Sequence, residues 1–312
     1  MQSHSHNSHQ HHSHHNHHHH APPTDVAGKA FIAGIILNGL YVAVQVVTGF
    51  MTHSMAMLAD AGHNLSDVAS LALSLMAFRW AKKKRTQHYT YGFKKSTILA
   101  ALTNAVVLLI TIGILGYESV LRLFHPQPVE GGIVAIIAGI GIVINLASAM
   151  LFFKDKDHDL NTKGAYLHLM TDALVSLAVV IAGIIIYYTH WYWVDGAISI
   201  IVLSVILGGT WSLLSGSFRM SLDAVPEHID IEKIEKVILD VKGVNSMHHL
   251  HVWAMSTTQN ALTGHVVVDE QLTFDEKMEV VHLIKHELEH HHINHATIEL
   301  ESATMPCHDD EC

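Results

Sequence analysis

The stretch GGIVAIIAGIGIVINLASAMLFF occupies residues 131–153 and contains no charged side chain. A helix needs about 20 predominantly apolar residues to cross the hydrocarbon core of a bilayer. Backbone polar groups inside lipid must be satisfied within the segment itself, so a run of this length is expected to be a transmembrane α-helix. This stretch therefore places the chain among integral membrane proteins.

Five further apolar stretches are long enough to cross a bilayer by the same criterion. They occupy residues 30–51, 55–80, 96–121, 164–188 and 191–214. The sequence therefore predicts an α-helical polytopic membrane protein with six transmembrane helices, followed by a small polar domain. No charged leader with a short apolar segment and a cleavage site precedes the first stretch, so a secretory signal peptide is not expected.

The composition excludes several other classes of protein. Charged residues make up 15% of the 312 residues, whereas soluble domains are about one quarter charged. The formal net charge of −10 removes the electrostatic basis for binding nucleic acid. The two cysteines, Cys307 and Cys312, lie at the end of the chain, so no disulfide framework holds a core. Eleven of the 30 histidines fall within residues 1–20, and a histidine-rich tract of this kind indicates metal binding.

Lysine and arginine are concentrated in two of the loops between the apolar stretches. The loops after the second and fourth stretches carry Lys82, Lys83, Lys84, Arg85, Lys94, Lys95, Lys154, Lys156 and Lys163. The loops on the opposite side contribute only Arg122. Because cytoplasmic loops carry the excess of positive charge, both termini are expected in the cytoplasm and the protein in the cell (inner or plasma) membrane. The lysine-rich loop can also meet anionic lipid.

The composition becomes polar from residue 223 onward. Residue periodicity predicts helices over residues 229–239 and 274–290 and strands over residues 247–255, 261–268 and 296–300. An α-β-β-α-β order can form a small sheet with helices on one face. We therefore divide the chain into a disordered His-rich arm (1–28), a transmembrane domain (29–222), an α/β metal-binding domain (223–304) and a Cys/His acidic tail (305–312).

Two of the apolar stretches carry a histidine followed four residues later by an aspartate. The second stretch contains His63 and Asp67, and the fifth contains His168 and Asp172. Ionisable groups inside a bilayer cost about 2.5–3.5 kcal/mol for a central aspartate on insertion scales, so they indicate function. A spacing of four puts each pair on one helical face. Two facing pairs would supply two imidazole nitrogens and two carboxylate oxygens, a set suited to tetrahedral Zn²⁺.

The structural alternative is that these pairs are buried hydrogen bonds that lock two helices together. Two matching pairs on separate stretches favour the metal site. Asp60 shares the helical face of His63 and is expected to support the ligands or a gate, with direct metal binding as the less favoured role. Asp195 is expected at a helix end or in packing. Hydrogen bonds between helices are expected from Asn38, Gln45, Asn104 and Asn145.

Five segments of the chain form a specific set, although each is weak alone: LADAGHNLSDVASL, YTYGF, GAYLHLMTDALVSLAV, HHLHVWAMS and HATIELE. Through them the chain, from residue 29 to residue 312, resembles the cation diffusion facilitators of the bacterial zinc/cadmium/cobalt efflux type. The resemblance implies a homodimer of six-span protomers with a cytoplasmic ferredoxin-like domain, and Zn²⁺ efflux driven by inward proton movement. The resemblance places the transport site on His63, Asp67, His168 and Asp172, the residues of the two pairs described above. In that family a histidine at the position of His63 accompanies zinc preference, whereas aspartate there broadens selectivity.

The resemblance also implies a structural or regulatory zinc site in the C-terminal domain, at His248, His265 and Glu301. His248 and His265 lie on adjacent predicted strands and can face each other, with Glu301 on the third strand. Other histidines compete for the same role: His249, His251 and His295. The alternative is that all of these are solvated surface histidines.

Cys307 and Cys312 flank His308 in an acidic end. Two thiolates and an imidazole can hold one metal ion. Proteins of the family that this chain resembles carry a similar cysteine pair. A flexible tail without a fixed role is the alternative.

Two interpretations belong to other classes of protein. His286, Glu287 and His290 form the His-Glu-x-x-His motif of zinc peptidases on a predicted helix. The motif is expected to face solvent, away from any cleft, because the apolar stripe of that helix runs through Phe274, Met278, Val281, Ile284 and Leu288. An enzyme is therefore not expected. A membrane-anchored metal sensor or buffer is the other alternative. The N-terminal histidines are expected to gather metal, with a purification tag as the alternative.

Overall fold

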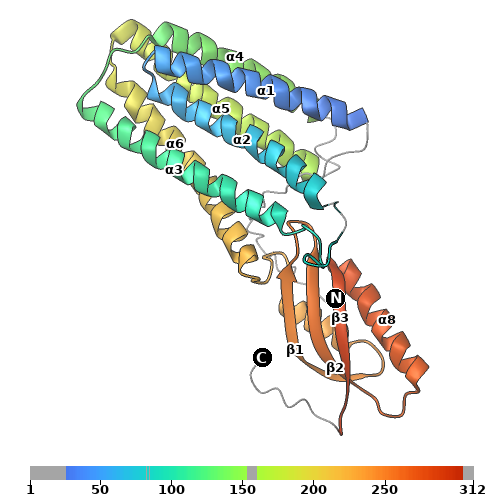
Figure 1. Cartoon of the computed structure of the whole chain (residues 1–312). Coiled ribbons are helices and arrows are strands. Elements are labelled where there is room, and N and C mark those ends of the chain that lie inside the picture. The colour runs from blue at the N-terminus through green and yellow to red at the C-terminus, as the bar shows by residue number, and fades with distance from the viewer. Residues whose placement is uncertain (1–25, 82, 84, 153–159, 305–312) are drawn as a thin grey trace, which may run out of the picture.

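A computed structural model of the chain describes residues 26–81, 83, 85–152 and 160–304 (Figure 1). Six long helices come first and lie side by side as a bundle: α1 (Val26–Met51), α2 (Met55–Ala81), α3 (Ser96–Phe124), α4 (Gly131–Phe152), α5 (Leu160–Thr189) and α6 (Trp193–Ser221). Their bounds follow the apolar stretches closely, and α6 continues past the expected end at residue 214. Residues 1–25 of the predicted arm and the whole predicted tail (305–312), with Cys307 and Cys312, lie outside the described residues.

Four helices of the described chain are long and apolar enough to cross a bilayer: Ser96–Phe124, Gly131–Met150, Tyr166–Thr189 and Trp193–Ser221. The corresponding apolar segment of α1 is shorter, Asn38–Met51. α2 is less apolar because it carries Asp60, Asp67 and Arg79. The helix with the most polar candidate residues is thus the least typical of a membrane span in its composition.

The bundle is built on close helix packing. α4 lies against α5, where a Cβ on Gly183 would come 2.6 Å from the carbonyl oxygen of Gly131, so glycine is needed for this approach. α3 lies against α6, where the buried hydroxyls of Ser119 and Ser199 are 2.6 Å apart. α2 contacts α1, α3, α5 and α6. Most of its polar side chains therefore have other helices within reach.

The C-terminal domain follows the predicted α-β-β-α-β order, with α7 (Ile231–Leu239), β1 (Val244–Ala254), β2 (Asn260–Val268), α8 (Phe274–His290) and β3 (Ile293–Ser302). Its sheet has the order β1-β2-β3, with β1 antiparallel and β3 parallel to β2. The two helices pack against the sheet over a core that includes Ile234, Ile238, Leu262, Ile284 and Leu288.

The first turn of α8 departs from the predicted apolar stripe. Thr273 and Glu276 form a capping box that satisfies the first N–H groups of this helix. Phe274 is 76% exposed and Met278 47% exposed, so their predicted burial was wrong. The buried face begins later, and the start of α8 lies outside the core, because the buried residues of the helix are Val280, Val281, Ile284 and Leu288.

The bundle meets the C-terminal domain at the α2–α3 connection and the end of α6. The contacts that join these parts include Lys95 Nζ with Asp223 Oδ1 (2.6 Å), Arg219 Nη1 with Glu227 Oε1 (3.5 Å), Thr97 Oγ1 with the Thr257 N–H (3.1 Å), and the rings of Tyr91 and His295 (5.6 Å between centroids). The sheet end nearest the bundle therefore includes the start of β3 (Figure 1).

Candidate metal centres

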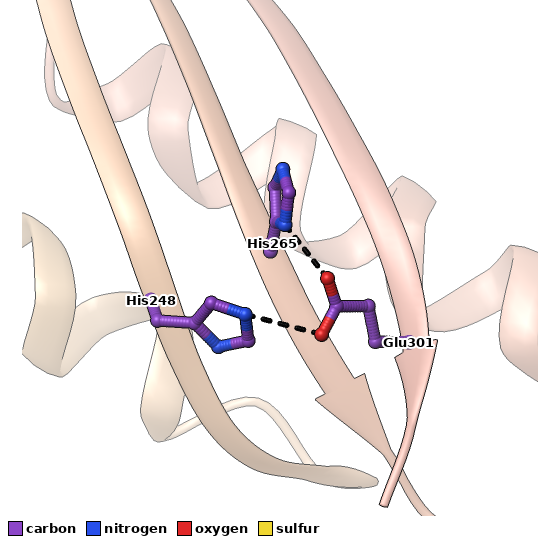
Figure 2. A group of neighbouring side chains, drawn as sticks. All are labelled: His248, His265 and Glu301. Carbon is purple, nitrogen blue, oxygen red and sulfur yellow. Dashed lines mark hydrogen bonds and ion pairs between the residues drawn. The ribbon is translucent and has the colours of Figure 1, made fainter. Parts of the chain in front are cut away.

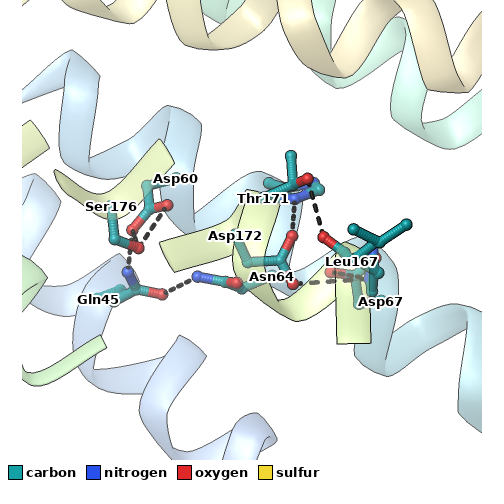
Figure 3. A network of polar contacts seen from close by, with 10 residues as sticks. Gln45, Asp60, Asn64, Asp67, Leu167, Thr171, Asp172 and Ser176 are labelled. Carbon is teal, nitrogen blue, oxygen red and sulfur yellow. Dashed lines mark hydrogen bonds and ion pairs between the residues drawn. The ribbon is translucent and has the colours of Figure 1, made fainter. Parts of the chain in front are cut away.

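His63 and Asp67 on α2 and His168 and Asp172 on α5 converge between the two helices, and Figure 3 shows the two carboxylates in this network. His63 Nε2 lies 2.9 Å from Asp172 Oδ1. His168 Nε2 lies 3.5 Å from Asp67 Oδ2 and 3.6 Å from Asp172 Oδ2. The spacing of four in each pair places both members on one face of the helix. The four residues predicted as a site are therefore neighbours in the fold.

The separation of these donor atoms is compatible with a single ion. Donors about 2.1 Å from a tetrahedral zinc ion lie roughly 3.4 Å from one another. The two donor distances between α2 and α5 are 2.9 Å (His63 Nε2 to Asp172 Oδ1) and 3.5 Å (His168 Nε2 to Asp67 Oδ2). One donor atom from each of His63, Asp67 and Asp172 lies within 4.8 Å of the others. His168 lies outside this group of three, so binding of one ion by all four residues requires its imidazole to move toward the other donors.

The cluster is closed on one side and open on the other. The side chain of Asp172 is 5% exposed and that of His63 is 16% exposed. Asp67 and His168 are more open, at 32% and 46%. Asp67 is the member of its pair nearer the end of α2, and His168 is the member nearer the start of α5. The open side thus faces the helix ends that join the lysine-containing connections.

A second cluster joins all three strands of the C-terminal sheet (Figure 2). His248 on β1 is directly paired with His265 on β2. Glu301 on β3 lies between them: its Oε1 is 2.7 Å from His265 Nδ1 and its Oε2 is 3.1 Å from His248 Nε2. The Glu301 side chain is 9% exposed. A nearly buried carboxylate beside two imidazoles is a chemically suitable set for zinc.

Two family comparisons cover both parts of the chain. Residues 31–220 match the family described as the cation efflux transmembrane domain. Residues 226–303 match the cation efflux protein, cytoplasmic domain. The chain belongs to the cation efflux family.

Relatives of this cation efflux protein match it over most of its length. The cadmium, cobalt and zinc/H(+)-K(+) antiporter of Bacillus subtilis is 37% identical, covering 88% of this chain and 89% of the relative. The metal cation efflux system protein CzcD of Cupriavidus metallidurans is 39% identical, covering 88% and 85%. The zinc transporter ZitB of Escherichia coli is 33% identical, covering 93% and 92%. A solved metal-bound C-terminal domain of a CzcD transporter is 39% identical and covers 23% of this chain and 99% of that chain, with a TM-score of 0.22.

Asp60 of this cation efflux protein, on α2, is held by residues from two other helices, α1 and α5 (Figure 3). Gln45 Nε2 donates to Asp60 Oδ2 at 2.6 Å, and Ser176 Oγ lies 3.3 Å from both carboxylate oxygens. Gln45 Oε1 accepts a hydrogen bond from Asn64 Nδ2 at 2.9 Å. The expected interhelical role of Gln45 is confirmed. Ser176 was not singled out from the sequence, although it follows Asp172 by four residues and so shares its face.

Asp195 lies in the first turn of α6, in agreement with its expected place at a helix end. Its carboxylate accepts hydrogen bonds from Ser54 Oγ (2.5 Å) and from the N–H groups of Met55 (2.6 Å) and Ala56 (3.2 Å). These are the first N–H groups of α2, which have no partner within their own helix. Asp195 therefore satisfies the start of the helix that carries His63. The sequence indicated the location of Asp195 but not this partner.

The strand cluster has two neighbours that the sequence left unresolved or missed. A register shift between His248 and His251 contains His249 with φ of 51°, and the His249 ring lies 5.2 Å from that of His265. Glu299 Oε2 lies 3.6 Å from His265 Nε2, and its side chain is 68% exposed. Glu299 precedes Glu301 by two residues, and residues two apart on a strand face the same side of the sheet. This spacing could have identified Glu299 from the sequence.

The other candidates lie elsewhere. His295 contacts Tyr91, away from the strand cluster. The three residues of the His-Glu-x-x-His motif are exposed on α8, as expected. Cys307 and Cys312 lie outside the described residues.

Proposed function

We propose that this protein is a zinc/proton antiporter that exports Zn²⁺ from the cytoplasm, with Cd²⁺ and Co²⁺ as further substrates. The observation that carries the proposal is the convergence of His63, Asp67, His168 and Asp172 from two helices. The names of three relatives, which include cadmium, cobalt and zinc antiport, cation efflux and zinc transport, support it.

The exchange follows from the chemistry of the four ligands. Zinc binds neutral imidazole and ionised carboxylate, so protons and zinc compete for the same groups. Without metal, the 2.9 Å contact between His63 Nε2 and Asp172 Oδ1 is made through a proton. An incoming zinc ion replaces this proton on the cytoplasmic side, and protons from outside displace the ion after the site reorients. The two gradients are thereby coupled.

The open side of the cluster supports entry from the cytoplasm. Asp67 and His168 are the more accessible ligands and are nearer the ends of α2 and α5 that join the positively charged loops. Positive loops lie on the cytoplasmic side. Zinc enters there and moves toward Asp172, and rocking of α2 and α5 against the other helices opens the site outward.

The proposed assembly is a homodimer in the cell (inner or plasma) membrane, with six spans per protomer and both termini in the cytoplasm. The transmembrane domain comprises residues 29–222 and the ferredoxin-like metal-binding domain residues 223–304. The match to the family's cytoplasmic domain and the α-β-β-α-β order support the second unit. In that domain, His248, His265 and Glu301 hold a structural or regulatory zinc ion, to which the tail can add Cys307 and Cys312.

The transport proposal is tested with purified protein in sealed proteoliposomes that report Zn²⁺ uptake and proton movement together. Asp172→Ala and His168→Ala are each expected to abolish zinc-driven proton flux. Thr171→Ala is the matched control, since its exposed hydroxyl bonds to the Leu167 carbonyl of its own helix. Wild-type flux in the Asp172 variant would overturn the site assignment.

The strand cluster favours a second candidate function, a membrane-anchored zinc sensor or buffer. In that case the protein binds zinc through the C-terminal domain and moves none across the membrane. Zinc accumulation inside sealed vesicles separates the two functions directly. Glu301→Ala, with exposed Glu299→Ala as its control, is expected to leave accumulation measurable if transport is the function. A wild-type protein that binds zinc without vectorial movement would support the sensor.

A further inference from the structure

The exposed face of α8 carries a pair of histidines that belongs to neither cluster described above. The rings of His286 and His290 lie 4.9 Å apart between centroids, in an edge-to-face arrangement. Both side chains are exposed and one helical turn apart. Histidines spaced in this way on a helix can bind one zinc ion together. Peptidase chemistry does not follow, because Glu287 is exposed as well, whereas a catalytic site needs a cleft that encloses its substrate.

The electrostatics of this end of α8 favour a cation. His290 is the last residue of the helix, and His291 occupies the C-cap position. The dipole at a helix C-terminus attracts positive charge. Glu287 Oε1 lies 3.8 Å from His286 Nδ1 and adds a negative charge beside the pair. Lys285 is the opposing charge on the same exposed stretch.

The position of the pair in the fold is also informative. α8 ends at His290, and β3 begins at Ile293. His295 on that strand contacts Tyr91 in the α2–α3 connection. The C-terminal end of α8 is therefore the end of the helix nearer the bundle, whereas its first turn lies at the far end of the domain (Figure 1).

We propose that His286 and His290 form a third, open zinc site on the surface of the C-terminal domain. The two imidazole nitrogens bind the ion, and water completes its coordination. Two protein ligands bind zinc more weakly and exchange it faster than the closed sets of structural sites. Such a site suits loading of Zn²⁺ next to the bundle, and it goes beyond the proposed transport function.

Residue-resolved modification of the full-length protein tests this site. Diethyl pyrocarbonate modifies exposed neutral imidazoles, and mass spectrometry reads each histidine separately. Zn²⁺ alone, in excess over the 30 histidines of the chain, is expected to slow modification of His286 and His290 together. His286→Ala is expected to abolish zinc protection of His290, and His290→Ala that of His286. Because both residues are exposed, these variants are expected to fold.

The matched control is His282→Ala, one turn earlier on the exposed side of α8. It is expected to leave zinc protection of His290 unchanged. Asp172→Ala is expected to leave it unchanged too, so this test is independent of the transport site. Protection of His290 that survives His286→Ala would overturn the proposal. So would loss of protection in the His282 variant, or wild-type protein in which zinc protects neither residue.

Discussion

His63 Nε2 on α2 lies 2.9 Å from Asp172 Oδ1 on α5, although the two residues are 109 positions apart in the chain. The other oxygen of the same carboxylate lies 3.6 Å from His168 Nε2. One buried aspartate therefore contacts both imidazoles. The type of ligand atom at position 63, an imidazole nitrogen beside this carboxylate, should therefore influence which metal ion the cluster binds.

We expect His63→Asp to shift metal preference toward ions that favour oxygen. Imidazole suits Zn²⁺, whereas carboxylate suits Mn²⁺. The ratio of Zn²⁺ to Mn²⁺ flux should fall by roughly tenfold, which corresponds to about 1.4 kcal/mol of differential binding. Flux of each metal into proteoliposomes measures this ratio. His63→Ala is the control, because it removes a ligand without adding an oxygen and should lower the fluxes together. An unchanged ratio in the aspartate variant would contradict the assignment of His63 as a ligand.

Gln45 is expected to position the cluster without touching the ion. Its amide donates to Asp60 and accepts from Asn64, the neighbour of His63. Gln45→Leu leaves these groups without that partner and should weaken apparent zinc affinity by about tenfold, the lower end of the range for groups that bond a metal ligand directly, because Gln45 bonds only neighbours of the ligands. Ser176→Ala removes only the two 3.3 Å contacts to the carboxylate of Asp60 and should have a smaller effect. The measurement is KM against kcat for zinc flux. Equal affinity in both variants and the wild type would refute this role.

The apolar stretches and the paired histidines were predictable because their physical cause is local. A helix in lipid must be apolar along its length, and α4 therefore begins at the predicted Gly131. The spacing of His63 and Asp67 alone places them on one face. The strand pairing of His248 with His265 was likewise accessible, because the two alternating segments follow one another in the chain.

The supporting contacts were not predictable because they depend on how distant helices dock. Asp195 is 140 positions from Met55, and no local pattern specifies that its carboxylate accepts the Met55 N–H. The same holds for Ser176 and Asp60. Phe274 matched the apolar period of α8, yet it is exposed, because periodicity does not say where the core ends.

Asp195→Ala should destabilise the bundle. The substitution leaves the buried N–H groups of Met55 and Ala56 without their acceptor, and loss of a helix N-terminal acceptor costs about 0.5–2 kcal/mol. Thermal unfolding in detergent should show a lower Tm. Asp195→Asn keeps one acceptor oxygen and should lie between the alanine variant and the wild type. An alanine variant with the same Tm as the wild type would show that the contact does not stabilise α2.

The capping box of α8 should make the start of this helix sensitive to acid. The Thr273 N–H and Oγ1 both donate to Glu276 Oε2, and these bonds hold the pKa of Glu276 below its ordinary value of 4.5. A carboxylate with a lower pKa in the folded state stabilises the fold above its unfolded pKa. That contribution is lost as the pH falls below 4.5 through the folded pKa.

Hydrogen-exchange protection of the first amides of α8 should therefore decrease as the pH falls through this acid range. Glu276→Gln keeps an acceptor oxygen but cannot titrate, so its protection should be lower at neutral pH and nearly independent of acid. Glu270 is the control, because hydrogen bonds from Ser302 and Thr304 also lower its pKa. Glu270→Gln should preserve the acid response at the start of α8. An acid response that persists in Glu276→Gln would show that another group controls the opening of this turn.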